Sequence, residues 1–289
     1  MMAQPLQAGA DPAAPAATKH DRGGAPIVEL AGVEKSFGTG DEVVHALGPL
    51  DLAIAAGSFV SVVGPSGCGK STLLRLIAGL ETPSQGRLRR YGAALDGPSR
   101  DVGIVFQDHV LFPWASVLEN VMLPAEVMAL PRQAARQRAD WLLELTGLKD
   151  FAGHRPHMLS GGMRQRAAFC RALLADPKML LLDEPFAALD ALTREELSLE
   201  LSRLWQDLGR TALLITHSID EAVLLGDRLI VMSRRPGRIR LDMPIDLPRP
   251  RDIVTEKHPR FLEIRQTARE LLFDARKVDG KVDRKADPP

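Results

Sequence analysis

The sequence predicts an α/β fold with a buried, largely parallel sheet, and three observations support this. Apolar runs of strand length occur at residues 59–63, 102–106, 179–182 and 212–216. The run at 179–182 is apolar at every position, which is typical of a strand buried on both faces. A helical pattern follows the first run after a short glycine-rich stretch. With 289 residues, of which 45% are hydrophobic, the chain is long enough to bury a full α/β core.

Composition narrows the possible partners. The chain has 37 Lys and Arg against 37 Asp and Glu, and this zero net charge disfavours nucleic acid as a partner. Its two cysteines, Cys68 and Cys170, do not form a disulfide framework or a metal cluster and are interpreted as reduced thiols. No apolar run approaches the roughly 18 residues of a membrane span. Residues 1–25, rich in Ala, Pro and Gly, are expected to be a disordered lead-in without a signal peptide.

The most informative motif follows the strand at 59–63 and comprises Gly64, Pro65, Ser66, Gly67, Cys68, Gly69, Lys70, Ser71 and Thr72. A glycine-rich turn between a strand and a helix aims backbone N–H groups and the positive helix end at one point, where a polyphosphate can bind. Lys70 then supplies a cation for the β- and γ-phosphates, and the Ser71 hydroxyl a ligand for Mg²⁺. The motif indicates a nucleotide but not its use, and a glycine turn with an unrelated lysine is the alternative.

The N-terminal part predicts short β segments. Residues 27–33 are expected to form an edge strand, and further short strands are expected at 43–50 and 52–54. Phe37 lies upstream of the phosphate loop, where its ring could stack on an adenine. An ordinary core position is the equally favoured alternative for this side chain.

Two further candidates lie between the strands at 102–106 and 179–182. Gln107 ends the first strand, and ligands of open α/β sheets collect at that carboxyl edge. Residues 116–148 predict a helical insertion between two sheet-forming halves. Ser160, followed by Gly161 and Gly162, is a natural helix N-cap with uncovered N–H groups. It predicts either a second anion-binding helix end or an ordinary capped helix.

Acidic side chains and a histidine follow the last two apolar runs. The run at 179–182 delivers Asp183 and Glu184 to the carboxyl edge of the sheet. Asp183 could hold Mg²⁺, and Glu184 could polarise a water for attack on a γ-phosphate. His217 follows the run at 212–216 and is interpreted as a γ-phosphate sensor.

Capping patterns predict the remaining helices. Thr193 with Glu196, and Ser218 with Glu221, have the spacing of capping boxes. Apolar residues between 261 and 272 recur at helical spacing and predict one amphipathic helix that packs against its own domain.

Taken together, the chain resembles the ATP-binding-cassette (ABC) ATPases. Their Walker A, Q-loop, signature, Walker B, D-loop and switch-histidine motifs match, in this order, residues 64–72, Gln107, 159–162, 182–185, 188–190 and His217. The likeness spans about residues 27–239. It implies a P-loop cassette with a mixed central sheet, an antiparallel β subdomain and a helical signature subdomain. The implied ATPase domain is 26–247, with the helical subdomain at about 108–165, and 248–289 is a C-terminal extension with one helix and a disordered tail.

The resemblance also implies roles for single residues. Glu184 would be the general base, with His217 at the γ-phosphate and Gln107 also in the catalytic set. Magnesium would be held by Ser71, Gln107 and Asp183. The ATP-binding residues would be Phe37, residues 64–72, Ser160, Gly161, Gly162 and Asp190. Of these, Ser160 and Gly162 would reach the ATP bound by a second copy of the chain.

The implied cofactors are ATP and Mg²⁺, and the implied partners are a second copy, transmembrane permease subunits and, indirectly, an extracytoplasmic solute-binding protein. The chain would work at the cytoplasmic face of the membrane. Residues 112–114, 185–194, 217–222 and 233–239 look like those of importers for nitrate, sulfonates and taurine. Met163 departs from the family's usual Gln, and Phe37 replaces a common Tyr. A soluble ABC-type ATPase and a P-loop metabolite kinase are the alternatives. The kinase would leave Ser160 and His217 without a role.

Overall fold

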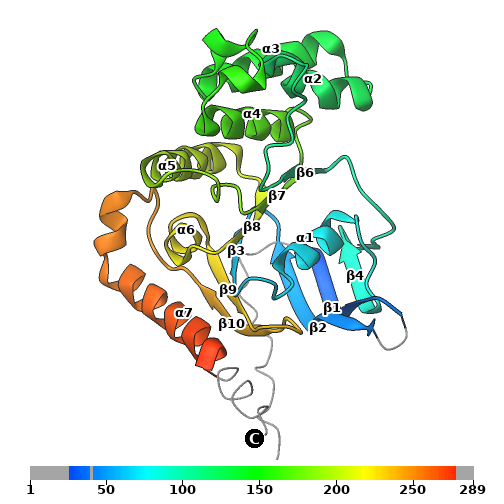
Figure 1. Ribbon diagram of the computed structural model, residues 1–289, viewed down its shortest axis with the longest axis vertical. Coiled ribbons are helices and arrows are strands. Elements are labelled where there is room, and N and C mark those ends of the chain that lie inside the picture. Colours follow the sequence, from blue (N-terminus) through cyan, green and yellow to red (C-terminus); the bar gives the residue numbers. More distant parts are fainter. Residues whose placement is uncertain (1–25, 40–41, 278–289) are drawn as a thin grey trace, which may run out of the picture.

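The computed structural model describes residues 26–39 and 42–277. The disorder expected for residues 1–25 and for the C-terminal tail lies outside the described residues. Figure 1 shows two sheets in one half of the molecule and a group of helices at the opposite end. In the described part, no helix combines the length and apolar character needed to cross a membrane.

The larger sheet has six strands in the order β10-β9-β3-β8-β7-β6. The strands are β3 (Phe59–Val63), β6 (Val102–Val105), β7 (Met179–Asp183), β8 (Thr211–Thr216), β9 (Arg228–Met232) and β10 (Ile239–Pro244). All neighbours are parallel except β10, which pairs antiparallel with β9. Every residue of β3 and β8 is buried, as their mostly apolar runs predicted. The expected mixed central sheet is therefore confirmed.

The smaller sheet is antiparallel, with the order β2-β1-β4-β5. Its strands are β1 (Pro26–Phe37), β2 (Val44–Ala55), β4 (Gln85–Arg90) and β5 (Ala93–Ala94). The prediction of an edge strand at 27–33 is wrong, because β1 pairs with β2 on one side and β4 on the other. The two short segments predicted at 43–50 and 52–54 form one strand, and its register with β1 shifts between Val33 and Lys35, opposite Gly48 and Pro49.

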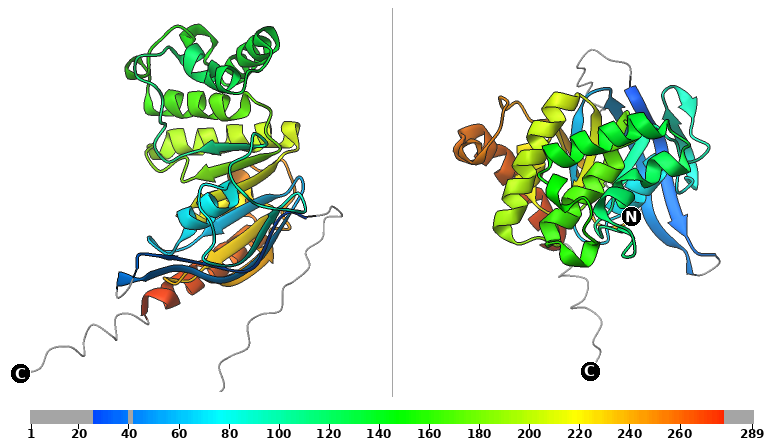
Figure 2. Two further views of the ribbon diagram at one scale, coloured as in Figure 1. Left: turned by 90° about the vertical axis from the view of Figure 1, so that its right-hand side faces the viewer. Right: turned by 90° about the horizontal axis from the view of Figure 1, so that it is seen from above.

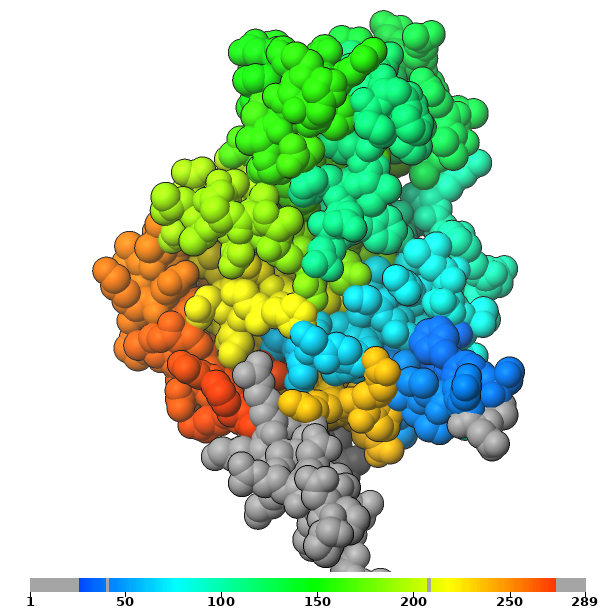
Figure 3. All heavy atoms as spheres, viewed as in Figure 1, coloured from blue at the N-terminus to red at the C-terminus, as the bar shows by residue number. Residues whose placement is uncertain are grey.

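Seven α-helices are described: α1 (Lys70–Ala78), α2 (Val117–Val127), α3 (Arg132–Leu145), α4 (Gly161–Leu173), α5 (Ala191–Leu208), α6 (Ile219–Leu225) and α7 (Pro259–Lys277). Short 3₁₀ segments occur at Lys149–Phe151, Pro156–Met158 and Ile253–Lys257. Figure 2 shows α2, α3 and α4 as a separate layer above the sheets, and in Figure 3 the same green region stands out as a lobe. The helical insertion expected at 116–148 thus corresponds to α2 and α3.

Two cores position the phosphate loop between the sheets. The apolar face of α1 packs in one core with side chains of both sheets, including Ile54 of β2 and Leu181 of β7. The second core joins the helical lobe to the other face of the six-stranded sheet, where Trp205 of α5 meets Phe59 edge-on at 5.1 Å between ring centroids. The loop before α1 is therefore held by a helix that is packed on two sides.

The C-terminal extension packs back on the domain. Phe261, Ile264 and Ala268 of α7 are buried in a third core with residues of α6 and β9, while Leu262 points outward. This confirms the amphipathic helix. Arg251, just before α7, is 3% exposed and donates hydrogen bonds to the carbonyl oxygens of Val223, Gly226, Ile245 and Leu247. It thereby caps the C-terminal end of α6.

The start of α5 differs from the prediction. The helix begins at Ala191, and the Asp190 carboxylate caps it by accepting from the Thr193 N–H at 3.0 Å. Thr193 is consequently inside the first turn, and the predicted capping box with Glu196 is wrong. Aspartate at this position is among the strongest N-caps, so the helix starts three residues earlier than expected.

Candidate functional site

The glycine loop between β3 and α1 depends on glycine at several points. Gly67 and Gly69 have φ angles of +72° and +101°, a region that other residues rarely adopt. A Cβ on Gly69 would lie 2.5 Å from Leu47 Cδ2, and one on Gly64 would lie 2.8 Å from Cys68 Sγ. Because α1 begins at Lys70 without a side-chain cap, its first N–H groups remain available to an anion.

Lys70 lies inside this loop. Its ammonium donates hydrogen bonds to the carbonyl oxygens of Gly64 at 2.9 Å and Pro65 at 3.1 Å, and the residue is 5% exposed. Burial lowers the pKa of Lys70, and the nearby Cys68, Glu184 and Asp183 oppose this shift. The lysine and the acidic pair of the neighbouring strand therefore share one electrostatic environment.

Ser71 and Asp183 form a pair of oxygen donors. The Ser71 hydroxyl donates to Asp183 Oδ1 at 3.1 Å. Burial raises the pKa of Asp183, against the Ser71 hydrogen bond and the charges of Arg75, Lys70 and His217. Among the described residues, no group of three or more His, Cys, Asp or Glu side chains is arranged to hold a metal ion. One hydroxyl and one carboxylate still suit Mg²⁺, which keeps waters and substrate phosphates as its other ligands.

Glu184 and His217 meet at the same edge. Glu184 Oε1 lies 2.6 Å from His217 Nε2, and the glutamate side chain is 14% exposed against 43% for the histidine. The Glu184 N–H donates to the carbonyl oxygen of Ile215 at 2.8 Å, and its φ of +46° is unusual for a residue other than glycine. Backbone strain of this kind clusters at functional sites. The contact joins the ends of β7 and β8.

The turn that carries His217 is held by a ring of hydrogen bonds. Thr216 Oγ1 donates to Glu221 Oε2 at 2.5 Å and accepts from the Ser218 N–H at 3.0 Å. The Ser218 hydroxyl accepts from the Glu221 N–H at 3.2 Å and caps α6, as expected. The Glu221 carboxylate, however, binds Thr216 instead of completing the capping box, so this half of the prediction is wrong.

Arg194 of α5 extends the ring to the segment after Glu184. Its guanidinium lies 3.7 Å from Glu221 Oε1 and donates to the carbonyl oxygens of Phe186 at 3.3 Å and Leu189 at 2.8 Å. Burial raises the pKa of Glu221, with the Thr216 hydrogen bond and the Arg194 charge opposing it. Sequence reasoning missed Thr216 and Arg194. The nearest signal was the Ser-x-x-Glu pattern at 218–221, which was interpreted only as a helix cap.

Ser160 and its glycines lie next to the start of α5. Ser160 is exposed and caps α4, with its side chain accepting from the Met163 N–H at 3.2 Å. A Cβ on Gly162 would lie 2.6 Å from Thr193 Cγ2, so α4 and α5 touch at their N-terminal ends. Asp190, the N-cap of α5, is also exposed, and the hydrogen bond that it accepts from the Thr193 N–H lowers its pKa.

The other predicted residues stand apart from this group. Phe37 is 38% exposed, and Lys35 Nζ lies 4.9 Å from its ring centroid. Gln107 is exposed beyond the end of β6. Within residues 26–39 and 42–277, no hydrogen bond or ion pair joins Phe37, Gln107 or Ser160 to the phosphate loop. The structure thus brings together the lysine, the serine, the acidic pair and the histidine, but not the stacking, amide and signature residues.

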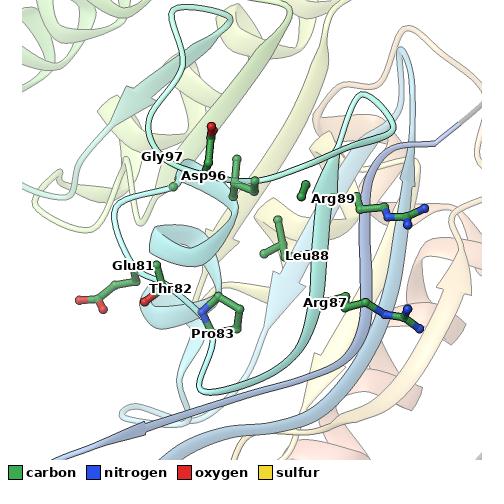
Figure 4. Close-up of a pocket in the computed structure, with 11 residues that line it drawn as sticks. Glu81, Thr82, Pro83, Arg87, Leu88, Arg89, Asp96 and Gly97 are labelled. Atoms are coloured by element: carbon green, nitrogen blue, oxygen red, sulfur yellow. The ribbon is translucent and has the colours of Figure 1, made fainter.

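A cavity of about 290 Å³ lies elsewhere, between the end of α1 and the strands β4 and β5. Figure 4 shows Leu88 facing it, while Arg87 and Arg89 extend to the other side of β4. Glu81 and Asp96 stand at its rim. None of the predicted site residues lines this cavity.

The site combines a glycine loop between a buried strand and a helix with an acidic pair and a histidine at the ends of neighbouring parallel strands. This combination is typical of a P-loop nucleoside triphosphatase. The antiparallel sheet and the helical lobe, whose helix α4 is capped by Ser160, are the further features of the cassette type. The protein-family model described as "ABC transporter" matches residues 47–187.

Similar proteins agree with this class. An uncharacterised ABC transporter ATP-binding protein of Methanocaldococcus jannaschii is 43% identical over 247 residues, which is 86% of this chain and 91% of that protein. The aliphatic sulfonates import ATP-binding protein SsuB of Bacillus licheniformis is 44% identical, covering 81% and 89% of the two chains. The taurine import ATP-binding protein TauB of Roseobacter denitrificans is 43% identical, covering 83% and 92%.

A solved ATP-binding cassette, in a dimeric post-hydrolysis state bound to ADP and Pi, has a TM-score of 0.67 and 34% identity. It matches 77% of this chain and the whole of that one. The chain therefore belongs to the ABC transporter family, as one of its ATP-binding proteins. This confirms the expected fold class and the expected ABC-type ATPase.

Proposed function

We propose that this chain hydrolyses ATP for an ABC importer of a small solute. The observation that carries the hydrolytic role is the 2.6 Å contact between Glu184 and His217, beside a phosphate loop with a buried Lys70. A carboxylate that is held at the open edge of the sheet can accept a proton from an attacking water. His217, more exposed than Glu184, would bind the γ-phosphate and keep the glutamate oriented.

The remaining roles follow from charge and position. Lys70 would leave the loop carbonyls and bind the β- and γ-phosphates, since the loss of its hydrogen bonds to Gly64 and Pro65 is offset by charge-assisted bonds to phosphate. Ser71 and Asp183, with Gln107, would hold Mg²⁺. When bound, this ion would neutralise charge on the phosphates. Phe37 would stack on adenine.

A second copy of the chain would complete each site. Ser160, Gly162 and Asp190 lie together at the touching ends of α4 and α5, without a hydrogen bond to their own phosphate loop in the described residues. Exposed helix N-termini bind anions, so they can serve the ATP of a neighbouring molecule. The dimeric form of the solved cassette supports this arrangement.

The solute and the membrane partners are proposed from the relatives. Proteins named for aliphatic sulfonate import and taurine import are 43–51% identical to this chain, so we propose a sulfonate, taurine or a similar small solute as the cargo. Nitrate, which the sequence resemblance implied, is the further candidate. The ATPase domain would be 26–247. Its helical part, about 108–165, would dock on permease subunits beside Gln107 at the cytoplasmic face of the membrane, and an extracytoplasmic solute-binding protein would deliver the cargo.

The test is the Glu184→Gln variant, which keeps the size of the side chain but removes its basicity. It should bind ATP like the wild type, hydrolyse it at least 100-fold more slowly, and change from monomer to dimer with Mg-ATP in light scattering. Glu200→Gln, a surface glutamate paired with Arg166, is the matched control and should behave like the wild type. Brisk hydrolysis by Glu184→Gln would exclude the assigned base. A variant that binds ATP tightly yet stays monomeric would exclude the two-copy site.

A further inference from the structure

The loop between β9 and β10, residues 233–238, supports the phosphate loop from outside. It is fastened to β2, because the Gly237 N–H donates to the carbonyl oxygen of Ala46 at 3.0 Å and the Gly48 N–H donates to that of Gly237 at 3.1 Å. This segment was noted in the sequence only for its likeness to importers. The established motifs give it no part in nucleotide binding.

The 233–238 loop is braced internally. The Ser233 N–H donates to the carbonyl oxygen of Arg238 at 2.8 Å, and the Ser233 hydroxyl accepts from the Arg238 N–H at 2.9 Å. The same hydroxyl donates to the carbonyl oxygen of Arg234 at 2.9 Å. These bonds close the loop on itself, so it can act as a fixed platform.

Two successive peptide groups of the phosphate loop rest on this platform. Arg235 Nε donates to the carbonyl oxygen of Gly67 at 3.0 Å. A Cβ on Gly237 would lie 2.1 Å from the carbonyl oxygen of Cys68, so the two backbones are in direct contact there. The carbonyl groups of Gly67 and Cys68 therefore both face the 233–238 loop.

The direction of these carbonyls fixes the direction of the next N–H groups. In a planar trans peptide the C=O of one residue and the N–H of the next point in opposite directions. The N–H groups of Cys68 and Gly69 are consequently turned away from the platform, toward the inner side of the phosphate loop. In agreement, the Cys68 N–H donates across the loop to the carbonyl oxygen of Pro65 at 3.3 Å, a long bond that it would exchange for one to a phosphate.

We infer that Arg235 is a positioning residue for nucleotide binding, which holds the Gly67 carbonyl outward so that the following N–H groups are oriented for the phosphates before ATP arrives. Donors that are oriented in advance lose less entropy on binding. The inference rests on the proposed binding of ATP by the phosphate loop. Gly237 has the complementary part, since only a residue without a Cβ can approach Cys68 this closely.

The charge of Arg235 also reaches the loop. Burial raises the pKa of the Cys68 thiol, and the charges of Lys70 and Arg235 oppose this. An effect of charge alone must therefore be separated from an effect of the hydrogen bond. Arg235→Gln keeps an N–H donor without the charge, whereas Arg235→Ala removes both.

The experiment measures KM and kcat for ATP, and Kd for ATP and ADP with a fluorescent nucleotide. Arg235→Ala should raise KM and both Kd values about three- to tenfold, the effect of one exposed, charge-assisted hydrogen bond, with kcat within about twofold of the wild type. Arg235→Gln should recover at least half of the lost affinity. Arg240→Ala, an exposed arginine of β10, is the control and should match the wild type.

Hydrogen exchange gives a readout that does not depend on nucleotide. The amide of Cys68, which donates to the carbonyl oxygen of Pro65, should exchange faster in Arg235→Ala, with an unchanged melting temperature. Unaltered KM and exchange in Arg235→Ala would overturn the inference, and so would equal losses in the Ala and Gln variants. If the wild type and Lys70→Ala both fail to bind ATP, the proposed function itself is wrong. If only Lys70→Ala fails and Arg235→Ala binds normally, the inference alone is wrong.

Discussion

Replacing Glu221 by alanine tests whether the turn that carries His217 must be held rigidly. The change removes the acceptor of the Thr216 hydroxyl, 2.5 Å away, and the anionic partner of Arg194. A hydrogen bond to a charged group contributes roughly 1.5–3 kcal/mol, and loss of that much orientation in the transition state lowers kcat by about 10- to 150-fold. Because Glu221 does not contact the phosphate loop, KM for ATP should change by less than about twofold.

Steady-state ATP hydrolysis is the assay, with Glu200→Ala as a control for the loss of one surface carboxylate. If Glu221 acts only by holding His217, the double variant with His217→Ala should be no slower than His217→Ala alone. The reasoning is refuted if kcat of Glu221→Ala stays within twofold of the wild type. It is also refuted if the effects of the two single variants multiply.

Three further predictions concern stability and assembly. The raised pKa of Glu221, caused mainly by burial, means that the folded state favours its neutral form, so its contribution to stability is complete below the ordinary value of 4.5 and is lost as pH rises through the higher folded-state pKa. The unfolding free energy of the wild type, measured with urea, should therefore fall between about pH 4 and 7. In Glu221→Gln, this part of the pH dependence should be absent. Arg251→Ala should lower the unfolding free energy by about 3–5 kcal/mol, because buried carbonyl groups lose their hydrogen-bond donor. The control Arg136→Ala, at an exposed arginine, should leave the unfolding free energy unchanged. Tryptophan fluorescence during urea unfolding measures both variants. Gly162→Ala should weaken ATP-dependent dimerisation at least tenfold in light scattering, because its Cβ would meet Thr193 Cγ2 at 2.6 Å, and Thr193→Ser in the same chain, which removes that methyl group, should restore it.

The strands of the larger sheet were predictable because burial on both faces leaves a local signal. β3 and β8 are buried throughout and mostly apolar, and their limits follow from the glycine loop and the histidine that end them. The pairing of β1 had no such signal. Its alternation of buried and exposed residues is the same whether one edge or both edges are hydrogen-bonded, so an edge strand was predicted where the structure has an inner one.

The residues of the candidate site also fall into two groups, those that the sequence predicted and those that it did not. Lys70, Asp183, Glu184 and His217 lie directly after strands or in the glycine loop, so the order of the chain indicated that they meet at one edge. Arg194 lies inside a helix, and its bonds to the segment after Glu184 depend on how α5 packs. Side chains that act through tertiary contacts carry no spacing pattern.

The short helix α6 connects two distant parts of the chain. Its first residues follow the turn of His217, and its last carbonyls are bound by Arg251 from the C-terminal extension. Seven residues of α-helix span only about 10 Å and do not bend over that length. Arg251 therefore links the C-terminal extension to one end of the helix whose other end follows the His217 turn, so that a shift of the extension acts on this turn through α6.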